Sequence, residues 1–163
     1  MSTLEVKAIQ APTGYDLQMP AGHIVQVVQT SKDPQSISTS SSSFVSMGFS
    51  ITITPSSTSS KILLQVHGGG QYLPIISQMA QVTIYRGSTN IGNATTGLMS
   101  HYTNSASAGT GMTISPLSMI ALDSPNTTSA TTYTIYAKTG GGVYQFHNGD
   151  RGRINFVAQE VAG

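Results

Sequence analysis

The sequence contains no cysteine and no tryptophan, and only 8% of its residues are charged, against about 25% in an average soluble domain. The lack of cysteine excludes a disulfide scaffold and thiolate metal sites. The seven lysines and arginines are scattered along the chain and the net charge is +1. Because phosphate binding needs clustered Lys and Arg, we expect no nucleic-acid partner. The low charge also argues against disorder of the charge-rich kind.

Long apolar runs are also missing. No run approaches the ~20 residues needed to span a bilayer, and the opening "MSTLEVKAIQ" lacks the apolar region of a secretory signal. We therefore expect no membrane partner. The 163 residues suit one domain with a core of its own, with or without a short arm.

The stretch Ser36–Ser60 has the composition of a flexible linker, since 16 of its 25 residues are Ser or Thr. Its middle, "FVSMGFSITI", nevertheless alternates apolar and small or polar residues. Alternation of this kind is typical of a strand with one buried face. The sequence predicts that the following side chains share that buried face: Val45, Met47, Phe49, Ile51 and Ile53. The Ser and Thr residues then form its solvent face and the turns on either side, with Pro55 ending the strand.

The same period of two recurs along most of the chain. It is found in "HIVQVVQT", "KILLQVH", "AQVTIYR", "TYTIYAK", "VYQFH" and "RINFVAQEV", and more weakly in "GLMSHYT" and "MTISPLSMIALD". Pro116 indicates a break or an edge position in the last of these. Turns are predicted at Arg86–Gly92 and at Asn148-Gly149, and one short helix fits Pro74–Ala80.

Eight to ten strands at intervals of about ten residues favour an all-β fold, an antiparallel, jelly-roll-like β-sandwich. We assign residues 23–163 to this sandwich domain and residues 1–22 to an extended N-terminal arm. An arm of this length on a chain with so little charge is expected to need a partner surface. Its apolar residues are the candidate docking residues: Leu4, Val6, Ile9, Tyr15, Leu17 and Met19.

Groups for catalysis or metal binding are sparse. None of the four histidines has a second histidine or a carboxylate at a metal-binding spacing on a predicted strand, although a sheet is able to bring His67 and His147 together. Asp123 and Asp150 are the only pair of acids that suggests glycosidase chemistry, and both fall in predicted turns. We therefore expect no metal, no cofactor and no enzymatic activity.

Two glycine runs have a structural interpretation. "HGGGQ" (His67–Gln71) is similar to the oxyanion loop of lipases, but the chain has no G-x-S-x-G elbow, which that chemistry requires. Consecutive glycines also let a strand bend or let another backbone approach closely. We prefer this second interpretation, and we extend it to "TGGGV" (Thr139–Val143).

Tyrosines are the remaining candidates for recognition: Tyr72, Tyr85, Tyr102, Tyr133, Tyr136 and Tyr144. On the outer face of a sheet they would form a recognition surface, because each offers a flat ring and a polar tip. The alternative, which we prefer, is that they belong to the core and to contacts between subunits.

Four segments resemble a β-rich module of bacteriophage virion proteins that is common in phages of aquatic bacteria. They are "HIVQVVQTSK", "SFVSMGFSITITPSSTSSKILLQV", "VTIYRGSTNIG" and "LDSPNTTSATTYTIYAK". The match covers about residues 22–139, and the blocks "ITPSSTSSKILL" and "LDSPNTTSATTY" are its most specific parts. The resemblance implies a jelly-roll-like sandwich that assembles as a homotrimer on the virion surface and has no catalytic role.

The position on the virion is a separate question. In many proteins of this kind the module forms the tip of a long fibre, whereas here only 22 residues precede it. This difference favours a capsid decoration (cement) protein, made in the host cytoplasm, that binds the major capsid protein on the outer surface of the head. The alternative is the receptor-binding knob of a short tail fibre, which would recognise the host surface. A polysaccharide depolymerase is a third interpretation, for which the sequence offers no paired carboxylates.

Overall fold

The computed structural model describes residues 20–33, 37–73, 78–103, 113–146 and 152–163, and all of the regular structure in them is β-strand. The strands are β1 (Ile24–Lys32), β2 (Ile37–Thr39), β3 (Val45–Ile53), β4 (Lys61–Leu73), β5 (Gln78–Arg86), β6 (Thr89–Asn90), β7 (Met99–Thr103), β8 (Thr113–Asp123), β9 (Thr131–Thr139), β10 (Tyr144–Phe146) and β11 (Ile154–Val161).

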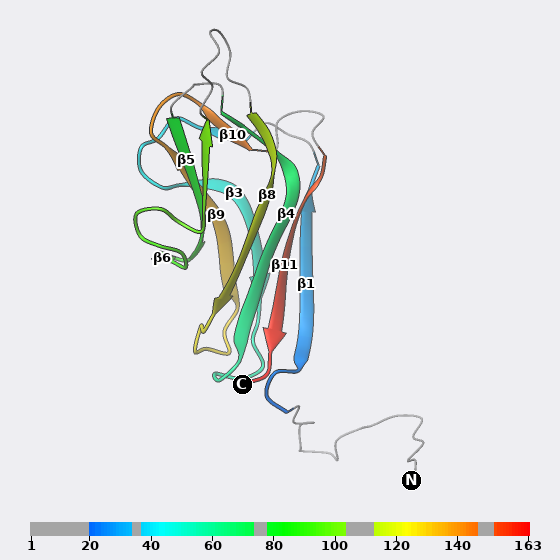
Figure 1. Cartoon of the computed structure of the whole chain (residues 1–163). Helices are drawn as coiled ribbons and strands as arrows, with labels where there is room; N and C mark the ends of the chain where they lie inside the picture. Colours follow the sequence, from blue (N-terminus) through cyan, green and yellow to red (C-terminus); the bar gives the residue numbers. More distant parts are fainter. Residues whose placement is uncertain (1–19, 34–36, 74–77, 104–112, 147–151) are drawn as a thin grey trace.

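The strands form two antiparallel sheets that pack face to face (Figure 1). One has six strands in the order β1-β11-β4-β10-β2, with β8 on the other side of β4. The other has five strands in the order β3-β9-β5-β6, with β7 also pairing with β5. The long strands thus give β1-β11-β4-β8 in one sheet and β3-β9-β5-β7 in the other. This is the strand order of a jelly roll, and it confirms the predicted fold class.

The core lies between the sheets and is built from alternate residues, as the period of two predicts. Met47, Phe49, Ile51 and Ile53 of β3 are buried, as are Ile62, Leu64 and Val66 of β4 and Ile154, Phe156 and Ala158 of β11. Across the interior, the rings of Phe49 and Phe156 lie 5.9 Å apart. Removing these apolar side chains from water provides the main stabilisation of the fold.

Val45 is an exception to the predicted buried face, because 36% of its surface is exposed. Among the described strands, β3 pairs with β9 alone, and the register of this pair shifts between Ser46 and Ser50, where Gly48 has a φ of 65°. This irregularity separates Val45 from the four buried residues that follow. The predicted burial of Val45 was therefore wrong: Val45 pairs with the buried Ala137, but it lies at the start of an edge strand, beyond the irregularity, where its side chain stays exposed.

Three local predictions also need correction. Gln78–Ala80 begin β5, so the helix proposed for Pro74–Ala80 is wrong there, and residues 74–77 lie outside the described residues. Strand β2 was missed, because it is three residues long and lies in a Ser-rich stretch. Asp123 ends β8 and does not lie in a turn.

Other local predictions are confirmed. Arg86–Gly92 contains the β5–β6 hairpin, with Gly87 at a φ of 57°. Pro116 lies in β8, which among the described strands pairs only with β4, and a register shift occurs beside it. An edge strand tolerates the missing N–H of proline. The predicted turn at Asn148-Gly149 lies outside the described residues.

The glycine run "HGGGQ" lies within β4, and the close backbone approach in its structural interpretation is confirmed. The register with β8 shifts between Gly68 and Gly70, so the strand is irregular there. Gly68 has a φ of 101°, and a Cβ atom at this position would lie 2.3 Å from the carbonyl oxygen of Arg153. The neighbouring N–H of Gly69 donates to that same oxygen at 3.1 Å. Only glycine allows the two backbones to approach this closely.

Candidate functional site

The predicted docking arm is not part of the described structure. All six of its candidate residues (Leu4, Val6, Ile9, Tyr15, Leu17 and Met19) fall within residues 1–19, outside the described ranges. The candidate sites described below therefore belong to the sandwich itself: three buried polar clusters and two exposed faces.

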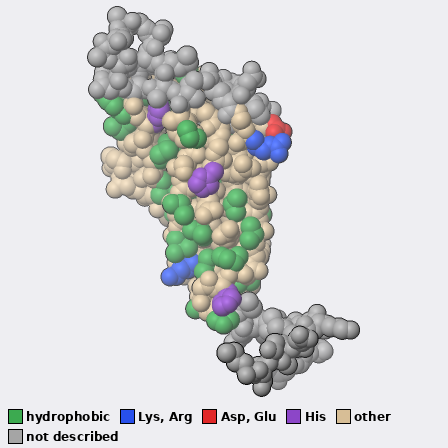
Figure 2. Space-filling view, turned by 45° about the vertical axis from the view of Figure 1, so that its right-hand side comes forward, with side chains coloured by type: hydrophobic (Ala, Val, Ile, Leu, Met, Phe, Trp, Pro, Cys, Tyr) green, Lys and Arg blue, Asp and Glu red, His purple; other side chains and the backbone are tan. Residues whose placement is uncertain are grey.

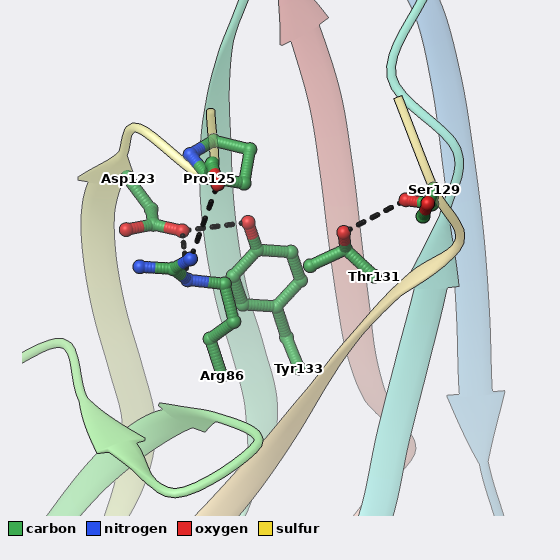
Figure 3. A network of polar contacts seen from close by, with 6 residues as sticks. All are labelled: Arg86, Asp123, Pro125, Ser129, Thr131 and Tyr133. Atoms are coloured by element: carbon green, nitrogen blue, oxygen red, sulfur yellow. Dashed lines mark hydrogen bonds and ion pairs between the residues drawn. The ribbon is translucent and has the colours of Figure 1, made fainter. Parts of the chain in front are cut away.

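The first polar cluster joins the two sheets near the ends of β5, β8 and β9 (Figure 3). Tyr133 donates a hydrogen bond from its hydroxyl to Oδ2 of Asp123 at 2.7 Å. Arg86 places Nε 3.0 Å from the same oxygen as an ion pair, and its Nη1 donates to the carbonyl of Pro125 at 3.3 Å. Tyr133 is fully buried and Asp123 nearly so.

This cluster has a structural role, because its contacts join the two sheets. Burial raises the pKa of Tyr133, the hydrogen bond and negative charge of Asp123 raise it further, and Arg86 opposes the shift. The phenol therefore stays protonated and remains a donor. Asp123 is thus bound to a tyrosine and an arginine within the fold, and Asp150, its suggested partner acid, lies outside the described residues.

The second polar cluster surrounds Glu160, which is fully buried in β11. Its Oε1 accepts hydrogen bonds from the N–H of Ser56 at 2.7 Å, from the hydroxyl of Ser56 at 2.6 Å and from the hydroxyl of Ser60 at 2.7 Å. Its Oε2 accepts one from Nε2 of Gln26 in β1. Burial alone raises the pKa of Glu160, but these hydrogen bonds outweigh burial and lower the pKa to about 2. The carboxylate therefore stays ionised and fixes the β3–β4 turn to β1 and β11.

This second cluster was not predicted from the sequence. The serines of "TPSSTSS" were predicted only to form a turn, whereas Ser60 is buried and Ser56 donates twice to Glu160. The available signal was a single acid in the otherwise apolar alternation of "RINFVAQEV". An acid on the buried face of a strand requires hydrogen-bond donors, and hydroxyl-rich turns are where such donors are found.

The third polar cluster contains Gln71, the last residue of "HGGGQ". Tyr144 is fully buried and donates to Oε1 of Gln71 at 2.8 Å, while Nε2 of Gln71 donates to the carbonyl of Pro116 at 3.0 Å. Burial raises the pKa of Tyr144. Nδ1 of His101 lies 3.2 Å from the hydroxyl of Ser115, and burial lowers the pKa of this histidine. The cluster joins β4, β8 and β10 to β7.

Histidines and acids do not gather into a metal site within the described residues, where no three His, Cys, Asp or Glu side chains converge. His67 contacts the hydroxyl of Ser118 at 3.2 Å, and His23 contacts the carbonyl of Pro20 at 3.0 Å. His147, considered as a partner for His67, lies outside the described residues. In the described part of the chain, no helix is long and apolar enough to cross a membrane.

An aromatic cluster lies on the outer face of the five-stranded sheet. Tyr85 and Tyr136 stack with ring centroids 4.1 Å apart, and Phe44 packs against Tyr85 at 6.2 Å. The ammonium group of Lys138 lies 4.7 Å from the centre of the Phe44 ring. The tyrosines thus have two roles, because Tyr133 and Tyr144 belong to the core, whereas Tyr85 and Tyr136 are half-buried on the outside.

The outer face of the six-stranded sheet, formed by β1, β11, β4 and β8, carries most of the strongly exposed apolar side chains. We call it the β1–β8 face. Its exposed apolar side chains lie at its two edges: Val27 on β1, and Ile120 and Leu122 on β8, with exposed fractions of 55% to 62%. Figure 2 shows this side of the molecule, where hydrophobic side chains lie among uncharged ones and charged side chains are few.

The three central rows across the β1–β8 face contain apolar and neutral polar residues. One row, given by the strand register, is Val27–Gln159–Leu63–Leu122, and the next is Gln29–Val157–Gln65–Ile120. A third row is Ser31–Asn155–His67–Ser118. None of the three rows contains Asp, Glu, Lys or Arg, and the next row, in which Val161 pairs with Lys61, brings a lysine to the end of the face. A sparsely charged surface with exposed aliphatic side chains is typical of the centre of a protein interface.

Comparisons with known proteins give a limited result. No protein-family model matches the chain, and no curated protein matches it. Among solved structures it is similar to the VP2 subviral particle of infectious bursal disease virus, with a TM-score of 0.42 and 13% identity, covering 97% of this chain and 38% of that one. It is also similar to the structure of the Gx strain of that virus, with a TM-score of 0.39 and 13% identity over 97% of this chain and 43% of that chain. This chain therefore spans about two fifths of the length of the viral chains that it matches.

Proposed function

We propose that the chain is a structural protein of a bacteriophage virion, a capsid decoration (cement) protein. In this proposal it assembles as a homotrimer, binds the major capsid protein on the outer surface of the head and stabilises the shell. It is made in the host cytoplasm, and it is not an enzyme and needs no cofactor. The jelly-roll order of its strands is the observation that carries the proposal, because this architecture recurs in viral capsid domains.

The two most specific blocks of the phage-module resemblance support this proposal through their place in the fold. "ITPSSTSSKILL" runs from β3 into β4, and "LDSPNTTSATTY" runs from β8 into β9. Each block therefore crosses from one sheet to the other. The first contains the donors Ser56 and Ser60 of the Glu160 cluster, and the second contains Asp123 and Tyr133. The shared motifs thus coincide with the connections that define the jelly roll.

The proposed stabilisation of the shell follows from the thermodynamic linkage between binding and assembly. A protein that binds only the assembled shell favours assembly by mass action. Three arms on one trimer attach to the lattice together, so the second and third contacts form at a high effective concentration. The decorated shell should then resist internal pressure without any chemical step.

Deleting residues 2–19 is expected to abolish capsid binding while the sandwich still folds. The deletion stops before Gly22, because the N–H of Gly22 donates to the carbonyl of Ala162 at 2.8 Å and belongs to the sandwich. Capsids lacking the protein would be mixed with full-length or truncated protein, sedimented, and assayed for bound protein. A matched control replaces the arm with a Gly/Ser linker of equal length. Full occupancy by the truncated protein would contradict the docking role of the arm.

The second candidate function, a receptor-binding knob, is favoured by the aromatic cluster of Phe44, Tyr85 and Tyr136. Aromatic rings with polar tips on an outer sheet face, with a lysine beside them, are suited to recognising a host surface molecule. If this is the function, Tyr136→Ala should reduce binding of the labelled protein to host cells at least tenfold. Tyr102→Ala, which changes another exposed tyrosine, is the control. Equal binding by the two variants would remove this cluster as a receptor site.

A further inference from the structure

We propose that the β1–β8 face is the contact between copies of this chain, and that its β1 edge packs against the β8 edge of the next copy. The inference rests on the homotrimer of the proposed function, but it can hold whether or not that trimer binds a capsid. It assigns a partner to a surface that the described part of the chain leaves exposed.

The position of the exposed side chains supports contact at two edges. Val27 on β1 is 57% exposed, and on β8 Ile120 is 62% and Leu122 is 55% exposed. Between these edges, Leu63 and Val157 are half-buried. A closed ring of three copies needs two different patches on each subunit, because each copy meets one neighbour on either side. The two apolar edges of one face provide such a pair of patches.

The charge pattern favours a second copy over an unrelated partner. The three rows of the face hold aliphatic side chains, amides, small hydroxyls and His67. Two such surfaces meet without like-charge repulsion and without burying an unpaired charge, both of which weaken association. Amides also supply donors and acceptors in equal measure, so Gln29, Gln65 and Gln159 suit a copy of themselves. A partner of ordinary composition would bring charged groups with no counterpart in these three rows.

The first test is the mass of the full-length protein in solution. We expect the unmodified chain to sediment as a trimer at micromolar concentration, and Ile120→Glu to weaken association at least 100-fold, because it places an unpaired charge in the contact. Tyr102→Glu is the matched control, since it adds the same charge to an exposed position on the other sheet, and should remain trimeric. A monomeric unmodified chain, or a trimeric Ile120→Glu variant, would overturn the proposal.

Cysteine cross-linking provides a second test that does not depend on a destabilising variant. The chain has no cysteine of its own, so introduced pairs report one contact each. We expect Val27→Cys combined with Leu122→Cys to form covalent dimers and trimers on oxidation, while either single variant stays uncross-linked. Cross-linking of the Val27→Cys variant with itself would show a two-fold contact and overturn the edge-to-edge arrangement.

The two proposals fail in different ways. A trimer that cross-links as expected but does not bind capsids would contradict the decoration function and leave this contact intact. A protein that decorates capsids while Ile120→Glu remains trimeric would contradict this contact and leave the decoration function intact.

Discussion

Glu160→Gln is expected to lower the free energy of unfolding by about 3 kcal/mol at pH 7. The carboxylate of Glu160 is fully buried and accepts four hydrogen bonds, from Ser56 (two), Ser60 and Gln26. Hydrogen bonds to a charged group contribute about 1.5–3 kcal/mol each. Glutamine has nearly the same shape, but it turns an NH₂ donor toward groups that are themselves donors. Urea unfolding of both proteins, followed by circular dichroism, measures the difference.

Asp33→Asn is the matched control for this variant. It removes the same charge from an acid whose side chain is 71% exposed and is paired with Arg153 at 2.6 Å. Exposed ion pairs contribute at most about 1 kcal/mol, so this variant should lie close to the unmodified protein. If Glu160→Gln and Asp33→Asn have the same midpoint in urea, the buried carboxylate contributes nothing special to stability.

The pKa of Glu160 also determines how the stability of the protein depends on pH. The pKa of Glu160 is about 2 in the folded protein, against 4.5 for the unperturbed group. Because the folded pKa is the lower one, the stabilising effect is fully present above about pH 4.5 and is lost as the pH falls toward 2. The difference of 2.5 pKa units corresponds to roughly 3 kcal/mol. Unfolding measured between pH 6 and pH 2 should show this loss in the unmodified protein and a smaller loss in Glu160→Gln.

Gly68→Ala is the second large effect, with an expected loss of at least about 3 kcal/mol or a failure to fold. The new Cβ would lie 2.3 Å from the carbonyl oxygen of Arg153. That oxygen belongs to backbone and is held by the N–H of Gly69 at 3.1 Å, so it cannot move aside without separating β4 from the start of β11. The φ of 101° adds strain of about 1–3 kcal/mol for a residue with a side chain.

Gly48→Ala is the control that distinguishes the backbone strain expected at Gly68 from the steric clash expected there. Gly48 also has a positive φ, of 65°, but no atom lies within 4 Å of the position that its Cβ would take. This control should therefore lose only the conformational part, about 1 kcal/mol. The midpoint in urea and the yield of folded protein would be compared for the two variants. A Gly68→Ala protein as stable as Gly48→Ala would mean that the two backbones are free to separate.

Strand-forming segments and their buried faces were largely predictable, since they depend on local alternation. In β4, β9 and β11 the alternate apolar side chains that the period of two places on one face are buried: Ile62, Leu64, Val66, Tyr133, Ile135, Ala137, Ile154, Phe156 and Ala158. Where both faces of a strand are apolar, the alternation does not indicate which face is buried. In "LSMIALD", Leu117 and Met119 are buried whereas Ile120 and Leu122 are exposed, and nothing local distinguishes the two pairs. Consequently the exposed apolar side chains of the β1–β8 face can be identified from the folded structure, but not from the sequence alone.

Local sequence patterns were sufficient to predict an all-β sandwich, to place Ser36–Ser60 within it, and to interpret the glycines of β4 as permitting a close backbone approach. These properties follow from period-two patterning and from the absence of a Cβ, which act within a few residues. The three-dimensional fold was needed to show that Ser56 and Ser60 surround Glu160, a residue about 100 positions away, and that Tyr133 contacts Asp123 across the two sheets. Such contacts depend on which strands become neighbours in the jelly roll, and strand pairing leaves no local trace because any alternating strand can pair with any other.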